Sequence, residues 1–276
     1  MGYFTKTVFT FITLGLVGVD SMGIQIAYYT DKGTQKQTNE DSLVIRTAKT
    51  NRGDVLMAAV CDGMGGLNRG ELASTTIVQA FSEWFEDKLP SLIEDGYDFL
   101  TIKSGLEFEI RKQSKRIENY AASRGMRLGT TLTMILVVEG KLITANVGDS
   151  RVYEVAEELR QLTKDHSLAQ REVERGTLRL EDVERYEHRN VLTQGIGDST
   201  NLLPDVKEER LYSDAVYLLC SDGFRHELSQ EEIRSALFAA RGKGDNNMKK
   251  ALEKLARKAM ERGEADNITA VAVNIS

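Results

Sequence analysis

The pattern of apolar positions predicts a chain of many short strands and a few long helices. Runs rich in β-branched and aromatic residues, bounded by Gly, Asn or charged residues, predict strands at 23–29, 43–46, 55–61, 132–138, 142–147, 151–155, 203–211, 216–220 and 268–275. Apolar residues at helical spacing predict helices over 69–88, about 102–122, 229–240 and about 248–263. We expect Pro90 to stop the first helix and Ser229 with Glu232 to form a capping box.

The order of these elements favours antiparallel sheets with helices packed outside them. Turn residues at 51–54 and 139–141 join neighbouring strands as hairpins, and regular strand–helix–strand alternation is absent. The last strand has no partner unless it joins an earlier sheet, so we expect one domain over residues 22–276. The highly charged segment 156–190 is interpreted as short helices in a surface insert.

The N-terminal segment stands apart from this pattern. Val8 to Val19 is a run of apolar and threonine residues that is too short to span a membrane, which takes about 20 residues. We therefore interpret residues 1–21 as an appendage of unknown role and expect no membrane span elsewhere.

Composition excludes several other classes. The 276 residues are 41% hydrophobic and 28% charged, as in globular proteins, so whole-chain disorder or a coiled coil is excluded. The formal net charge of −6 disfavours a generally basic nucleic-acid binder, and we expect no nucleic-acid partner. Cys61 and Cys220 lie far apart in apolar runs, which indicates buried, reduced thiols and a cytoplasmic protein.

Acidic residues recur where apolar strands begin or end. They are Glu40, Asp41, Asp62, Asp149, Asp222 and Asp266. An Asp-Gly or Gly-Asp pair alone is ordinary turn chemistry. Five acidic sites at separate strand ends, with Glu40 and Asp41 counted as one site, instead indicate a bound cation that offsets their repulsion. An all-oxygen ligand set suits magnesium or manganese. Zinc is poorly supported, because His166, His188 and His226 are isolated.

Eight motifs in order carry a family resemblance. They are NEDS, VCDGMGG, GTTLT, ANVGDSRVY, LTKDHS, RNVLTQGIG, LLCSDGF and ADNIT. Together they resemble the metal-dependent type 2C serine/threonine protein phosphatases (PPM family), in particular the compact bacterial branch, over residues 23–274. The resemblance implies an α+β fold, an α-β-β-α sandwich of two central antiparallel sheets flanked by helix pairs.

The resemblance also implies the roles of the acidic residues. Asp62 would bridge two Mn²⁺ or Mg²⁺ ions with the Gly63 carbonyl in one ligand shell, and Asp222 and Asp266 would hold the first ion. Glu40 and Asp41 would serve the second ion or its waters. Asp149 resembles the ligand of a third, weaker ion. Asp62, Asp222 and Asp266 are thus the predicted catalytic centre.

Elementary electrostatics agrees with such a mechanism. Two divalent ions and three aspartates have a net charge of about +1, and this positive charge can attract a phosphoryl dianion. A water bridging both ions is acidified. The implied activity is hydrolysis of phosphoserine and phosphothreonine by direct attack of a metal-bridging hydroxide, without a phosphoenzyme.

Three positions depart from the family pattern or stay open. Lys36 stands where the family often has a phosphate-binding Arg, so it provides a point charge instead of a bidentate fork. Met64 stands where some members carry a candidate acid His, which leaves the general acid unidentified. Arg151 is expected to order the Asp149 turn by a salt bridge or to cap a strand end. Segment 165–190 resembles the family's flap beside the active site, with an ordinary solvated helix pair as the alternative.

The expected partners follow from the family. They are phosphoserine and phosphothreonine proteins made by a serine/threonine kinase, and we expect the phosphatase to be a monomer. Two alternatives are a catalytically weak binding module with the same fold and a phosphatase dedicated to a single regulator protein.

Overall fold

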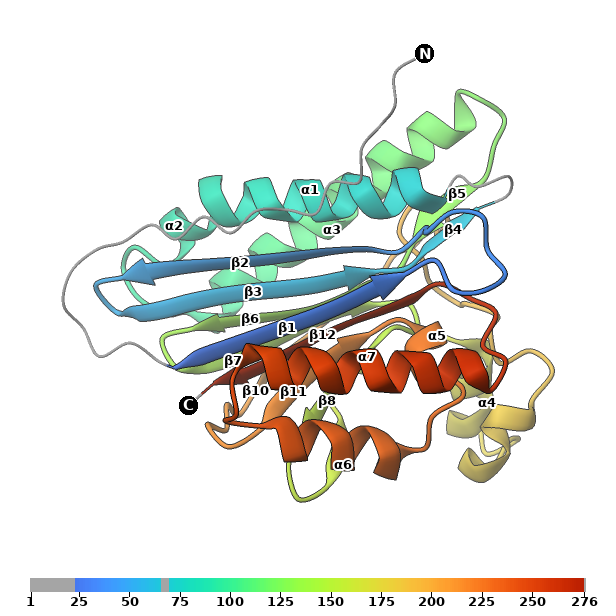
Figure 1. Cartoon of the computed structure of the whole chain (residues 1–276). Helices are drawn as coiled ribbons and strands as arrows, with labels where there is room; N and C mark the ends of the chain where they lie inside the picture. Colours follow the sequence, from blue (N-terminus) through green and yellow to red (C-terminus); the bar gives the residue numbers. More distant parts are fainter. Residues whose placement is uncertain (1–22, 66–69, 276) are drawn as a thin grey trace, which may run out of the picture.

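The computed structural model describes residues 23–65 and 70–275, and Figure 1 shows two sheets stacked face to face between helices. The predicted segment 1–21 lies outside the described residues. In the first sheet the order is β1 (Ile24–Asp31), β12 (Ile268–Ile275), β11 (Val216–Cys220), β8 (Arg151–Val155) and β9 (Leu159–Gln161). In the second it is β10 (Asp205–Glu209), β7 (Lys141–Val147), β6 (Leu132–Val138), β3 (Gly53–Cys61) and β2 (Ser42–Thr50).

Every strand pair in both sheets is antiparallel, and helices cover both outer faces. The second sheet carries α1 (Gly70–Asp87), α2 (Leu89–Leu92) and α3 (Phe99–Ala122), and the first carries α6 (Gln230–Ala240) and α7 (Asp245–Glu261). The predicted α-β-β-α sandwich is confirmed. Among the described residues no helix is long and apolar enough to cross a membrane.

The apolar residues form three buried layers. Leu56, Ala58 and Val60 of β3 face the first sheet, whereas Met57 and Ala59 face the helices. This strand is buried on both faces, which is why its sequence is a continuous apolar run and not an alternating one. Both cysteines are free and buried on the helix sides of their sheets, as the sequence predicts.

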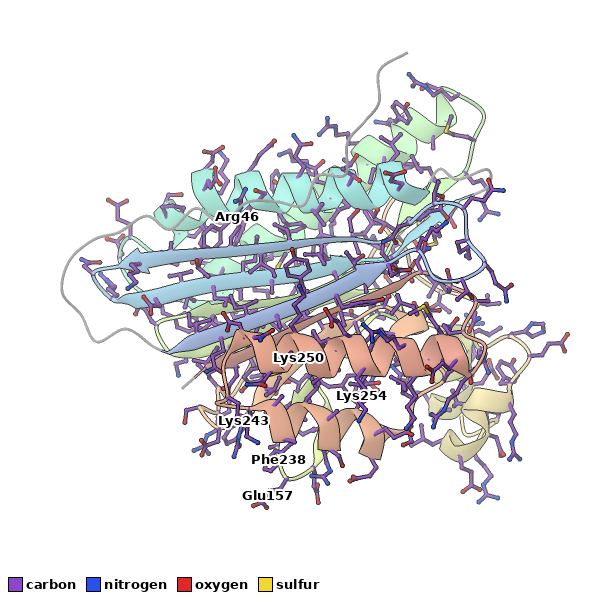
Figure 2. The ribbon with its side chains drawn as sticks, viewed as in Figure 1. Arg46, Glu157, Phe238, Lys243, Lys250 and Lys254 are labelled. Carbon is purple, nitrogen blue, oxygen red and sulfur yellow. The ribbon has the colours of Figure 1, made fainter. Side chains whose placement is uncertain are left out.

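Polar residues hold the outer helices. Arg46 of β2 donates a hydrogen bond to Ser82 of α1 over 2.8 Å, and Figure 2 shows it between the strand and the helix. Lys250 and Lys254 lie on the exposed side of α7 (Figure 2), while Met248 and Leu252 are buried beneath the helix. This apolar face holds α7 to the sheet, since helix stability in proteins comes mostly from packing.

The predicted elements differ from the structure mainly at short segments. Pro90 does not end the first helix, which stops at Asp87; it lies in the first turn of α2, where a missing N–H costs no hydrogen bond. Four short elements lack enough residues for a periodic signal. They are β4 (Gly63–Gly65), β5 (Leu128–Thr130), α2 and α5 (Asp222–Arg225). The charged insert contains β9, α4 (Leu168–Glu174) and a 3₁₀ helix over Leu180–Arg185.

Candidate metal centre

The predicted acidic residues gather at one edge of the sandwich, which here means the side where these strands begin or end. Asp62 follows β3 and Asp222 follows β11, while Asp41 and Asp266 precede β2 and β12. Because Cys61 pairs with Ser42 and Cys220 pairs with Ala270, these strand ends lie side by side within each sheet. The Ser221 hydroxyl donates to Asp41 Oδ2 over 2.9 Å and so joins the two sheets at this edge.

Asp62 is fixed through its backbone by two threonines. Its N–H donates to Thr131 Oγ1 over 2.9 Å, and its carbonyl accepts from the Thr130 hydroxyl over 2.9 Å and from the Thr131 N–H over 2.8 Å. Thr131 Oγ1 also bonds Ser150 Oγ at 2.9 Å. Sequence reasoning gave these threonines no role, and only their place in the GTT motif could have drawn attention to them.

Gly63 permits a close approach of backbones. A Cβ at this position would lie 2.4 Å from the Gly70 carbonyl carbon and 2.5 Å from the Glu40 carbonyl oxygen, closer than real contacts allow. The Gly70 N–H at the start of α1 donates to Glu40 Oε1 over 2.7 Å, which places a carboxylate at the positive end of the helix. Glu40 is thereby tied to the Asp62 turn.

The buried carboxyl groups repel one another. Burial raises the pKa of Asp62 well above its ordinary value, and Asp41, Asp222 and Asp149 raise it further. Burial, Asp222 and Asp266 raise the pKa of Asp41 to about 7, although hydrogen bonds from Thr269 and Ser221 oppose the rise. Carboxyl groups held this way are poised to bind cations.

The donor set fits a divalent ion. Asp41 Oδ1 and Asp222 Oδ1 are buried with no hydrogen-bond partner among the described residues, so each leaves a lone pair available. All six predicted acidic groups are hard oxygen ligands, which suit Mg²⁺ or Mn²⁺. Within 23–65 and 70–275, however, no three His, Cys, Asp or Glu side chains already form a set that could hold a metal ion.

Protein donors hold several of these carboxylates in the structure. Lys36 Nζ lies 2.7 Å from Asp266 Oδ1, and each side chain is 43% exposed. The loop that carries Lys36 is clamped by Asn267, whose Nδ2 donates to the Lys32 and Thr38 carbonyls over 3.0 Å and whose Oδ1 accepts from the Glu40 N–H over 2.8 Å. Asn267 was not singled out from the sequence, although the ADNIT motif contains it.

Two histidines lie near the edge without a clear proton-transfer role. The ring nitrogens of His226 lie 3.8 Å from Asp222 Oδ2 and from Glu264 Oε2. His166 Nδ1 accepts from the Gly148 N–H over 3.3 Å. Burial is the main cause of the lowered pKa of both rings, which favours the neutral form.

Met64 and Arg151 take structural positions. A Cβ at Gly195 would lie 2.5 Å from Met64 Cε, so Met64 packs on the segment after the insert. Arg151 Nη2 lies 2.7 Å from Asp165 Oδ2. Arg151 therefore forms a salt bridge beside the Asp149 turn, and its partner is Asp165.

Comparison with known proteins agrees with this fold and site. A family model described as Protein phosphatase 2C matches residues 31–257. Protein phosphatase PhpP of Streptococcus pneumoniae serotype 2 is 30% identical over 256 residues, covering 92% of this chain and 98% of the relative. Serine/threonine phosphatase stp of Listeria welshimeri is 31% identical over 251 residues, covering 89% of this chain and 94% of the relative.

Solved structures give the same result. Stp1 from Staphylococcus aureus superposes with a TM-score of 0.80 at 26% identity, covering 95% of this chain and 99% of that one. The catalytic domain of the serine threonine protein phosphatase PstP, solved in complex with two manganese ions, superposes with a TM-score of 0.75 at 27% identity, covering 92% and 99%.

The chain belongs to the protein phosphatase 2C family. The predicted enzyme class, a protein phosphatase, is confirmed, and the relatives give no support to the alternative of a binding module.

Proposed function

We propose that the protein hydrolyses phosphoserine and phosphothreonine in proteins at a centre of two Mn²⁺ or Mg²⁺ ions held by Asp62, Asp222 and Asp266. The observation that carries the proposal is the gathering of acidic residues at one edge of the sandwich. Burial raises the pKa of Asp62 and of Asp41 there, and one oxygen each of Asp41 and Asp222 has no hydrogen-bond partner among the described residues. Relatives named serine/threonine phosphatases, and one structure described with two manganese ions, support it.

The ions would supply positive charge and a bridging water of lowered pKa, so that a hydroxide attacks phosphorus directly. Asp62 would lie between both ions, with the Gly63 carbonyl beside it, and Asp222 and Asp266 would hold the first. Glu40 and Asp41 would hold the second ion or its waters. Thr131 would keep Asp62 in place through its hydrogen bond to the backbone.

Lys36 would bind the substrate phosphate. Its ammonium already lies at the rim of the site, 2.7 Å from Asp266 and 43% exposed, so a phosphate in the site is within reach of a side-chain rotation. Segment 165–190, with α4 and the following 3₁₀ helix, would act as the flap that selects substrates. We further propose a cytoplasmic monomer whose substrates come from a serine/threonine kinase.

Hydrolysis of matched phosphothreonine, phosphoserine and phosphotyrosine peptides tests the proposal. Each peptide is assayed with Mn²⁺, with Mg²⁺ and with a chelator. We expect phosphate release from the phosphothreonine and phosphoserine peptides with either metal ion, and no release with the chelator. Equal release from all three peptides would contradict the substrate class, and release in the chelator would contradict the metal mechanism.

A further inference from the structure

A buried cluster of two guanidinium groups and two carboxylates lies beside the candidate metal centre. Arg225 ends α5, three residues after Asp222, and Asp149 lies in the turn between β7 and β8. Asp165 precedes α4, and Arg151 begins β8. Asp149, Asp165 and Arg225 are 7%, 7% and 8% exposed. Four charges in a buried place are tolerated only when they neutralise one another.

Arg151 and Asp165 form one neutral pair within this cluster. Arg151 Nε lies 2.9 Å from Asp165 Oδ1, and its Nη2 lies 2.7 Å from Asp165 Oδ2, which is a bidentate contact. Gln161 Nε2 donates to the same carboxylate over 2.9 Å, and Arg151 Nη1 donates to the Tyr153 hydroxyl over 2.8 Å. The charge of Asp165 is therefore largely satisfied by Arg151.

Arg225 is held less tightly and contacts the backbone of the Asp149 turn. Its Nη2 donates to the Asp149 carbonyl over 3.3 Å and lies 3.9 Å from Asp165 Oδ2. Its Nε is buried with no hydrogen-bond partner among the described residues. The guanidinium charge is therefore fixed within hydrogen-bond distance of the Asp149 backbone.

We propose that Arg225 is the built-in counter-charge of Asp149 and that it keeps a third divalent ion from binding there. The inference rests on the proposed function of a metal-dependent phosphatase. The third ion at Asp149 is implied by the resemblance to the type 2C phosphatases. A cation held by Asp149 would lie close to a guanidinium that is buried in the fold, and two like charges in a buried place repel strongly. The centre would therefore work with two ions.

Counting bound manganese in the full-length protein tests the inference without measuring turnover. Equilibrium dialysis and native mass spectrometry are compared for the wild type, Arg225→Met and Arg225→Lys. We expect two ions on the wild type and on Arg225→Lys, which keeps the charge. Arg225→Met should gain a third ion, or bind it at least about tenfold more tightly, since a full like charge is removed at short range.

Asp149→Asn locates the additional ion. In the Arg225→Met background this change should return the count to two. In the wild-type background it should leave the count at two, a result that stays available if Arg225→Met does not fold. Folding of each variant is checked by circular dichroism and thermal melting.

Three results would overturn the inference: equal binding by folded Arg225→Met and the wild type, three comparable ions on the wild type, or loss of an ion on Asp149→Asn alone. If the proposed function failed instead, the wild-type protein would bind two ions but release no phosphate from a phosphopeptide.

Discussion

Lys36 Nζ lies 2.7 Å from Asp266 Oδ1, so a lysine ammonium contacts a carboxylate that we assign to the first metal ion. The ammonium offsets part of the negative charge at the edge, since Asp266, Asp62 and Glu40 all raise the pKa of Lys36. Binding of a metal ion at Asp266 would require Lys36 to turn away and would free it for the substrate phosphate.

Lys36→Met should therefore separate metal binding from substrate binding. We expect tighter Mn²⁺ binding, because the competing cation is gone, together with a roughly tenfold rise in KM for a phosphopeptide through loss of a charge-assisted contact. Lys36→Arg is the control and should restore the low KM. Calorimetric titration with Mn²⁺ and steady-state kinetics measure the two effects. Unchanged KM in Lys36→Met would remove Lys36 from the substrate site.

Gly63→Ala should damage the centre although it adds only one methyl group. The new Cβ would lie 2.4 Å from the Gly70 carbonyl and 2.5 Å from the Glu40 carbonyl, and both neighbours are backbone. We expect a loss of about 1–3 kcal/mol in the free energy of unfolding, with a fall in kcat. Urea unfolding and kinetics check this.

Gly105→Ala is the matched control for this change. Its Cβ would meet the flexible Leu92 Cδ1 at 2.8 Å, inside a helix where Ala is favoured over Gly. Equal effects of the two substitutions would contradict the close approach at Gly63.

Thr131→Val should destabilise the protein, whereas Thr133→Val should not. Thr131 Oγ1 accepts from the Asp62 N–H, so its loss leaves a buried donor unpaired and costs about 1–3 kcal/mol. Thr133 Oγ1 is buried with no partner among the described residues, so Thr133→Val should be neutral or stabilising. Chemical unfolding measures both variants. Of these two variants, activity should fall in Thr131→Val, because the Thr131 hydroxyl accepts from the Asp62 N–H.

The chelated protein should show a pH dependence that comes from the buried carboxyl groups. Folding raises the pKa of Asp41 from 3.8 to about 7, so the folded state keeps a proton that the unfolded chain has lost between these values. The Asp41 contribution to stability therefore decreases as pH rises through this window and stays unfavourable above it. His166 and His226, whose pKa values are lowered, act in the opposite direction as pH falls below about 6.5.

Asp41→Asn isolates the carboxyl effect from the histidines. In chelator, the melting temperature of Asp41→Asn minus that of the wild type should be larger at pH 8 than at pH 5. At pH 8 the wild type carries a buried charge on Asp41, and the asparagine carries none. Saturating Mn²⁺ should raise the wild-type melting temperature most at pH 8. A difference between the two proteins that does not change with pH would argue against the raised pKa of Asp41.

The sequence predicts the sandwich well because its strands and long helices have periodic apolar patterns. It also predicts which strand ends carry acidic residues, since each of them lies within two residues of a strand. The contacts of Lys36, Asn267 and Thr131 could not be predicted, because each joins segments that are far apart along the chain. Arg151 shows the same limit: Asp149 is its neighbour in sequence, whereas Asp165 is its partner in space.

The most direct test of the two-metal centre measures manganese content and phosphate release on the same samples of wild type and Asp62→Asn. Asp62 is the proposed bridge between both ions, so its loss affects both. We predict two ions and metal-dependent hydrolysis of a phosphothreonine peptide for the wild type. A folded Asp62→Asn variant should hold fewer ions and lose more than about 100-fold in kcat, since even outer-shell changes at metal sites cost about 10–100-fold. Wild-type rates and two bound ions in Asp62→Asn would contradict it.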